Sequence, residues 1–175
     1  MAVQEAELEA PVREHEEHAH DKLVIIAWSG DLDKVWPQMI LATTGAAMGM
    51  QTTIFFTFWG LFSLVKENVR ITGDNWMQKM VAMMDHPGME HLKLGKMNFA
   101  GAGPRMMLKL GKDHKVASPG ELLEMARELG VRFVPCQMTM DLLGLSREDM
   151  IDGLDEPAGA TTMLLEAQDA VTLFI

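Results

Sequence analysis

The sequence predicts an α/β fold in which helices flank a mainly parallel sheet. Short apolar runs alternate with stretches of helical periodicity, which is the pattern of strand–helix–strand units. The 175 residues, 48% of them hydrophobic, suffice for one core in one domain. Crossovers between such strands are expected to be right-handed. The predicted strands cover residues 23–28, 51–58, 131–134 and 171–175.

The first half of the chain contains two of these strands. Residues 23–28 form an uninterrupted apolar run that ends in a polar turn, which is typical of a buried parallel strand. A helix is predicted over residues 35–50, with Pro37 near its start. Residues 51–58 are dense in β-branched and aromatic side chains, so the second strand is predicted there. A short helix is expected over residues 59–69.

The middle of the chain, residues 85–117, is predicted to leave the sheet as a long loop. It has five glycines, two prolines and no clean period. Loops of this length are usually lids or binding elements. The segment is also locally basic, which suggests an anionic ligand, and Gly103 and Arg105 are its candidate substrate contacts. A charged loop that is simply solvated is the alternative.

A clear helix start follows this loop. Ser118, Pro119 and Glu121 form the pattern of a capping box with proline at the first helical position. The helix is predicted over residues 121–129, and Gly130 suits a left-handed C-terminal cap. The third strand is then expected directly.

The last third of the chain completes the alternation. A helix is predicted over residues 138–145, and Ser146 is expected to cap a further turn. A final helix over residues 160–170 leads into the apolar strand 171–175. These four strands, alternating with helices, predict the parallel sheet.

The N-terminal segment differs from the remainder in composition. Residues 1–21 contain seven acids against Arg13, so about −6 of the formal net charge of −10 falls there. This segment is predicted to be a flexible acidic extension. Its His15, His18 and His20 could bind a metal, but a solvated tail is the favoured interpretation and no metal site is predicted. An acidic chain of this kind also argues against nucleic-acid binding.

Cys136 is the single cysteine and the main candidate for chemistry. It lies where the third strand stops and a helical pattern begins, a position at which helix-start N–H groups can stabilise a thiolate. Gln137 and Met138 are the predicted donors. The alternative is a buried cysteine that acts as a small hydrophobic side chain.

A second wall for this site is predicted at the end of the first strand. Trp28, Ser29, Gly30 and Asp31 should lie at the same edge of a parallel sheet as Cys136, because strand carboxyl ends meet there. Gly30 would permit a close approach of the ligand. An ordinary polar turn before a helix is the alternative at this position.

The sequence favours neither a membrane span nor a bound cofactor. Residues 40–65 contain no charge, yet a helix followed by a strand explains their pattern better than a membrane span. No secretory signal begins the chain, so a reducing cytoplasm is the expected location. Neither a dinucleotide nor a phosphate-loop motif is present, and no cofactor is predicted.

Several segments together carry a resemblance to a known family. They are residues 28–34 (WSGDLDK), 46–50 (AAMGM), 55–61 (FFTFWGL), 134–140 (VPCQMTM) and 170–175 (AVTLFI). In this order and spacing the chain resembles the DsrE/DsrF/DsrH-like family, in its larger DsrE-type subgroup that is often labelled peroxiredoxin-like. The resemblance covers residues 22–175. The Pro-x-x-x-Thr-x-x-Cys pattern of true peroxiredoxins is missing from the sequence.

The resemblance implies a flavodoxin-like three-layer α/β sandwich that forms homo-oligomers. It implies a role in intracellular sulfur relay, as a sulfurtransferase or sulfur carrier. Cys136 matches the residue that would hold sulfane sulfur as a persulfide or thiosulfonate and pass it to an acceptor thiol. Donor and acceptor proteins of TusA-like or rhodanese-like type would be its partners.

Two alternatives remain open at this point. The protein could be a non-enzymatic module that binds a partner through its methionine-rich and aromatic surface, with a structural cysteine. It could also attach peripherally to a membrane through the uncharged stretch.

Overall fold

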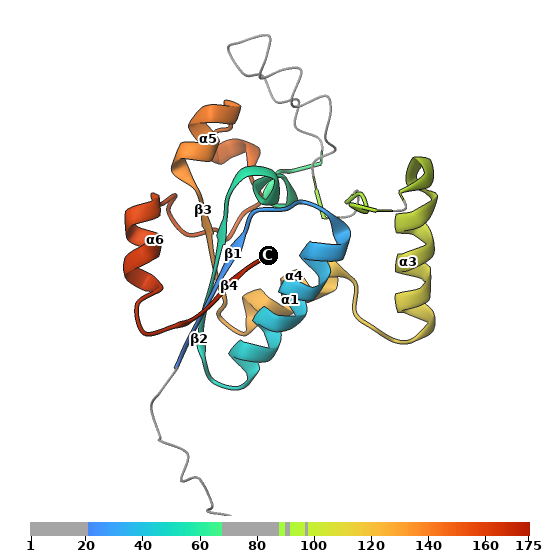
Figure 1. The fold of residues 1–175 in the computed structure, drawn as a ribbon, viewed down its shortest axis with the longest axis horizontal. Coiled ribbons are helices and arrows are strands. Elements are labelled where there is room, and N and C mark those ends of the chain that lie inside the picture. The colour runs from blue at the N-terminus through green and yellow to red at the C-terminus, as the bar shows by residue number, and fades with distance from the viewer. Residues whose placement is uncertain (1–20, 68–87, 90–91, 97) are drawn as a thin grey trace, which may run out of the picture.

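The computed structural model describes residues 21–67, 88–89, 92–96 and 98–175, and in these residues four strands form one parallel sheet (Figure 1). The strand order is β3-β2-β1-β4, and each neighbouring pair is parallel. The prediction of a parallel sheet is confirmed. The strands are β1 (Lys22–Ala27), β2 (Gln51–Phe56), β3 (Arg132–Pro135) and β4 (Val171–Phe174).

Helices lie on both faces of this sheet, which gives the three layers of a flavodoxin-like sandwich (Figure 1). On one face lie α1 (Leu32–Ala47) and α4 (Pro119–Glu128), and on the other lies α6 (Ala160–Glu166). The remaining elements are η1 (Phe58–Leu64), η2 (Phe99–Gly101), α3 (Ala102–Asp113), α5 (Gln137–Leu143) and η3 (Arg147–Asp149).

The two faces of the sheet are lined by alternate residues of each strand, as the two-residue period of a strand requires. Ile25 pairs with Ile54, which pairs with Phe133, and these three contribute to the large core under α1 and α4. Their neighbours Val24 and Phe55 point to the α6 side, where the buried cluster is much smaller.

The start of α4 confirms the predicted capping box. Ser118 Oγ accepts the N–H of Glu121, and the Glu121 carboxylate accepts the N–H of Ser118 at 2.7 Å. The hydrogen bond from the Ser118 backbone, followed by that from its hydroxyl, holds the pKa of Glu121 below its usual value. Gly130 has a φ of 78°, which confirms the predicted left-handed residue after the helix.

Helix α1 begins earlier than predicted. Its first residue is Leu32 and Asp31 is its N-cap, so Pro37 lies inside the helix rather than at its start. The short helix expected after β2 is a 3-10 helix, η1, and ends at Leu64. Residues 68 and 69 of that prediction lie outside the described residues, as do residues 1–20 of the predicted extension, including its three histidines.

The prediction of an irregular loop over residues 85–117 is wrong for its second half, which is helix α3. Gly101 caps the helix with a φ of 88°, and Pro104 sits in its first turn, where no backbone donor is needed. Gly111 lies against Trp36, since a Cβ atom there would be 2.4 Å from the indole ring. Gly101, Pro104 and Gly111 are therefore compatible with a helix and do not break it.

None of the helices in the described part of the chain is long and apolar enough to cross a membrane. The uncharged stretch of residues 40–65 is instead the second half of α1, then β2 and η1. Its apolar side chains are used largely to pack against the sheet, as the helix-then-strand interpretation predicted.

Candidate functional site

Cys136 lies at the junction between β3 and α5, as the sequence predicted. It is the N-cap of α5, and its N–H donates to the carbonyl of Phe56 at 2.9 Å. It also forms a parallel bridge with Ala158 on its other side. Backbone pairing on both sides therefore holds the cysteine at the carboxyl edge of the sheet.

The thiol itself is buried, as the alternative interpretation of Cys136 expected. Cys136 is 3% exposed and packs with Val24, Phe55 and Met163. Among the described residues, no helix-start N–H donates a capping hydrogen bond to the sulfur. The N–H of Gln137, a predicted donor, goes to the carbonyl of Ala158 at 3.0 Å.

The direction of the thiol follows from the alternation of β3. Arg132, Val134 and Cys136 are spaced by two, so they share the face of the sheet that α6 covers. Phe133 points to the opposite face and joins the large core. The same periodicity that buries Cys136 therefore places Arg132 on its side of the sheet.

Residues at the end of β1 form a compact turn. Trp28 stacks on Phe174 of β4, with the ring centroids 6.1 Å apart. The Ser29 hydroxyl accepts the N–H of Asp31 at 3.2 Å. Gly30 does permit a close approach, but of backbone rather than ligand: a Cβ atom would be 2.6 Å from the Trp59 carbonyl.

A polar link joins the ends of β2 and α5. The hydroxyl groups of Thr57 and Thr139 are 3.0 Å apart, and Thr139 Oγ1 also accepts the N–H of Phe58 at 3.2 Å. Phe58 has a φ of 46°, an uncommon and costly conformation for a side chain of this size. These contacts fix α5, and with it Cys136, to the strand next to β3.

A second polar cluster lies at the start of α1. Asp33 accepts the N–H of Gly95 at 3.0 Å and a hydrogen bond from Lys34 at 2.7 Å. Burial is the largest single influence on the pKa of Asp33 and raises it, but the bonds from Lys34 and Gly95 together lower it below its usual value. The N–H of Leu32 donates to the carbonyl of Lys93, so residues 92–96 are held against this helix start.

Gly103 and Arg105 do not join Cys136. Both lie on α3, which Figure 1 shows on the opposite side of the molecule from α5. Gly103 is buried, and its N–H donates to the carbonyl of Asn98 at 3.3 Å. Helix α3, which is the second half of the predicted basic loop, therefore does not cover the thiol.

The rim around the carboxyl edge of the sheet is apolar. Met138, the second predicted donor of α5, has a side chain that is 66% exposed. Other large apolar side chains are exposed on the neighbouring elements. They are Trp28, Phe58, Trp59, Leu142 and Phe174.

What covers the thiol is the segment of residues 155–159, here called the strap. It runs along the outer edge of β3: the N–H of Asp155 donates to the carbonyl of Phe133, and that of Ala158 donates to the carbonyl of Pro135. With the bond from Gln137 to Ala158, these contacts place the strap beside Cys136. Helix α6 follows directly and contributes Met163 to the cover.

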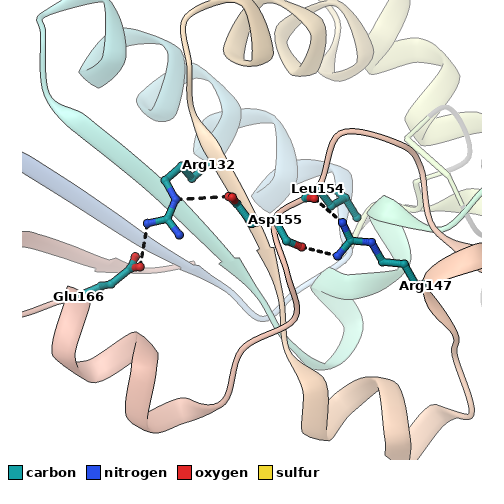
Figure 2. A network of polar contacts seen from close by, with 5 residues as sticks. All are labelled: Arg132, Arg147, Leu154, Asp155 and Glu166. Carbon is teal, nitrogen blue, oxygen red and sulfur yellow. Dashed lines mark hydrogen bonds and ion pairs between the residues drawn. The ribbon is translucent and has the colours of Figure 1, made fainter.

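Two arginines hold the strap and α6 in place, as Figure 2 shows. Arg132 donates to Glu166 at 2.8 Å and lies 3.4 Å from the carboxylate of Asp155. The hydrogen bond to Glu166 raises the pKa of Arg132. Arg147 donates to the backbone carbonyl of Asp155 and to that of the residue before it.

Sequence reasoning missed this group, although one signal pointed to it. Arg132 is a charged residue inside a short apolar strand, two positions before Val134 and four before Cys136. Its acidic partners Asp155 and Glu166 are too far along the chain for a periodicity argument to pair them. Among the residues that the structure describes, no group of three histidine, cysteine or acidic side chains is arranged to hold a metal ion.

Comparison with known proteins gives a consistent result. A sequence model of the DsrE/DsrF/DrsH-like family matches residues 19–174. An uncharacterized protein of Bacillus subtilis, YrkE, is 41% identical over 155 residues, which are 88% of this chain and 96% of that protein. The sulfur carrier protein DsrE2 of Allochromatium vinosum is 35% identical over 157 residues, which are 88% of this chain and 98% of that protein.

The fold is also similar to that of a solved structure. The crystal structure of the ychN protein from E. coli superposes with a TM-score of 0.53 at 13% sequence identity. The match covers 88% of this chain and 98% of that one. At this identity the likeness supports the fold and nothing further.

Proposed function

The chain belongs to the DsrE/DsrF/DrsH-like family, and from that premise we propose that it carries sulfane sulfur on Cys136. A general role in sulfur relay is supported by the family and by a relative that is named a sulfur carrier. The observation that carries the finer proposal is the position of Cys136. The only thiol of the chain is the N-cap of a helix at the carboxyl edge of the sheet, the edge at which α/β proteins usually bind their ligands.

The proposed reaction is an exchange between sulfur atoms without net oxidation. The Cys136 thiol loses its proton, and the thiolate attacks the outer sulfur of a donor persulfide. The donor's S–S bond breaks, its inner sulfur leaves with the electron pair as a thiolate, and a persulfide forms on Cys136. An acceptor thiolate then attacks the outer sulfur, and the Cys136 thiolate leaves.

The proposal includes protein partners, because a bound persulfide must be delivered. TusA-like and rhodanese-like proteins are the expected donors and acceptors, in a reducing cytoplasm and with this chain as a homo-oligomer. The exposed apolar rim supports a protein acceptor, since the exposed Met138 lies in the first turn of α5, two residues after Cys136.

Intact-mass spectrometry of the full chain tests the proposal. After incubation with polysulfide and removal of excess reagent, the wild type is expected to gain the mass of one or more sulfur atoms. A reducing agent should reverse the gain. Cys136→Ala serves as the control and should gain no mass. Equal loading of the two proteins, or an unchanged wild-type mass, would contradict the proposal.

A second candidate function is a partner-binding module in which the cysteine is structural. The observation that favours it is the burial of Cys136 at 3% exposure. In this case the thiol should react slowly at neutral pH, because apolar surroundings disfavour the charged thiolate. Measuring alkylation rate against pH separates the two functions, because a sulfur carrier needs a thiolate at neutral pH.

A further inference from the structure

A cavity lies directly beside the buried thiol. It has a volume of about 410 Å³ and is bounded by β3, the strap and α6. Val134, Ala158 and Met163 line it, and the same three residues pack in the small apolar cluster that contains Cys136. Cys136 itself is not among the lining residues. These side chains therefore separate the thiol from a space that is open to solvent.

Met163 is the largest of these three side chains and the one that comes from α6. It is 4% exposed and is the buried residue of α6, a helix of seven residues. Its neighbours Leu164 and Leu165 are 66% and 60% exposed, so they contribute little to holding the helix down. The helix start also lacks a side-chain cap, because its N-cap is Gly159.

Because α6 is held to the sheet by little apolar surface, the ion pairs of Arg132 contribute to holding it in place. Arg132, the first residue of β3, joins Glu166 of α6 to Asp155 of the strap (Figure 2). Both ion pairs are partly exposed, so each contributes little to the stability of the whole protein. They can nevertheless decide how often α6 and the strap separate from the sheet, because local opening involves few other contacts.

We infer that this cavity is the access route to Cys136, that Met163 closes it, and that Arg132 holds the closed state. Small sulfur compounds would enter between the strap and α6 and reach the sulfur when Met163 moves aside. The inference deepens the proposed function and rests on it for its purpose. Its geometry, however, can be tested without any sulfur transfer.

The charges around the cavity define what should pass most easily. Three carboxylates line it, from Asp155, Glu156 and Glu166, against the guanidinium of Arg132. Arg147 lies outside the lining, 3.9 Å from the Glu156 carboxylate, so these acidic and basic groups still leave a negative surplus of one when Arg147 is included. A surplus of negative charge disfavours anions at short range. The route therefore suits a neutral reagent or a protonated persulfide better than a dianion.

Alkylation of the single thiol by iodoacetamide measures access directly. In this reaction the Cys136 thiolate displaces iodide and forms one S–C bond. Met163→Ala is expected to raise the second-order rate about tenfold, because it removes the side chain between cavity and sulfur. Arg132→Gln is expected to raise the rate several-fold, while Arg132→Lys should retain part of the closure. Met163→Leu restores the volume and should react like the wild type.

Leu164→Ala is the matched control, since it truncates an exposed residue of the same helix and should leave the rate unchanged. The unfolding free energy of every variant is measured in parallel. A wild-type rate in Met163→Ala would overturn the inference. So would a set of rates that rises only in proportion to each variant's global unfolding constant, because the thiol would then react through unfolding.

The ratio of the alkylation rates of a charged and a neutral reagent tests the charge of the route, and a loss of packing does not change this ratio. Iodoacetate is a negatively charged analogue of iodoacetamide and should react more slowly with the wild type. Glu156 has a side chain that is 94% exposed, so Glu156→Gln should not disturb the fold. This variant is expected to raise the iodoacetate rate about twofold relative to that of iodoacetamide. An unchanged ratio would place the route elsewhere.

The two proposals fail in different ways. A chain that never gains sulfur from polysulfide, but whose Met163→Ala variant is alkylated faster, would retain the access route and lose the carrier function. A chain that loads sulfur on Cys136, but whose route variants all react like the wild type, would retain the function and lose this route.

Discussion

Phe55 and Phe56 are neighbours on β2, yet they lie in very different surroundings. Phe56 is fully buried and stacks on Phe133, with ring centroids 6.0 Å apart, in the large core beneath α1 and α4. Phe55 points to the other face and belongs to a cluster of five buried residues that includes Cys136. One face of the sheet thus carries a deep core, and the other carries a shallow one covered by a short helix.

This difference suggests that one face of the sheet provides most of the stability, while the other controls access to the thiol. Burial of apolar surface is the main source of folding free energy, so the α1 and α4 face should dominate the stability of the domain. The α6 face buries less and is held in part by exposed ion pairs. Regions with few buried contacts open locally at a lower free energy than global unfolding requires. The thiol lies in such a region, so exposing it requires only the local opening of the α6 face.

The largest effect is expected from truncating the two phenylalanines separately. Phe56→Ala should cost about 3–5 kcal/mol of unfolding free energy, because a stacked and fully enclosed ring leaves a cavity that cannot collapse. Phe55→Ala should cost at least about 1 kcal/mol less, since α6 can settle into the space. Urea unfolding of both variants measures the difference. Equal costs, or a larger cost for Phe55→Ala, would contradict the division between the faces.

A smaller effect is expected at the start of α4, the helix of the deep face that has a complete cap. Ser118→Ala should lower the unfolding free energy by about 1 kcal/mol, because it removes the hydroxyl that accepts the N–H of Glu121. Ser118→Thr keeps the hydroxyl and should retain most of the stability. If both variants unfold like the wild type, the capping box contributes nothing to this face.

The same cap predicts a pH dependence of definite sign. The pKa of Glu121 is lowered in the folded protein, so its contribution is fully present above its ordinary value of 4.5 and is lost as the pH falls through the lower folded value. Glu121→Gln should be the less stable protein at neutral pH, and the gap to the wild type should narrow on acidification below 4.5. Unfolding curves over this range test it. If the difference in unfolding free energy between the wild type and Glu121→Gln grew as the pH fell, the pKa of Glu121 would not be lowered by folding.

The smallest effect is expected from giving α6 the cap that it lacks. Gly159 has a φ of −91° and open space where a Cβ atom would lie, so Gly159→Ser is compatible with the backbone. The hydroxyl should stabilise the helix start by a few tenths of a kcal/mol. Alkylation of Cys136 should slow slightly, by less than about twofold. Faster alkylation would show that α6 does not control access.

The predictions from sequence were most accurate where the cause is local. The strands, the capping box at Ser118 and the strand-to-helix junction at Cys136 all depend on neighbouring residues, and each was found. Helix α3 was missed because its glycines and proline were interpreted as breakers. In the structure, Gly111 instead makes room for Trp36, a residue 75 positions earlier in the chain.

The candidate site was likewise predictable only in its local features. The strand-to-helix pattern identified Cys136 and the edge of the sheet, but not whether the thiol is exposed to solvent. The accessibility of Cys136 depends on Met163 and Ala158, and the position of these residues depends on ion pairs between Arg132 and two distant carboxylates. Similarly, Gly103 and Arg105 were predicted to contact substrate because they belong to a long, locally basic segment, and the fold places them on α3, away from Cys136.

The sequence by itself determined the strands, their faces and the start of α4, because alternation along a strand and capping at a helix start are set by adjacent residues. It therefore placed Cys136 at the end of β3. Only the tertiary structure decided what covers the sulfur, because that cover is built from contacts between segments that are far apart in the chain. Those contacts bring α6 and the strap over Cys136, and Arg132 joins the two.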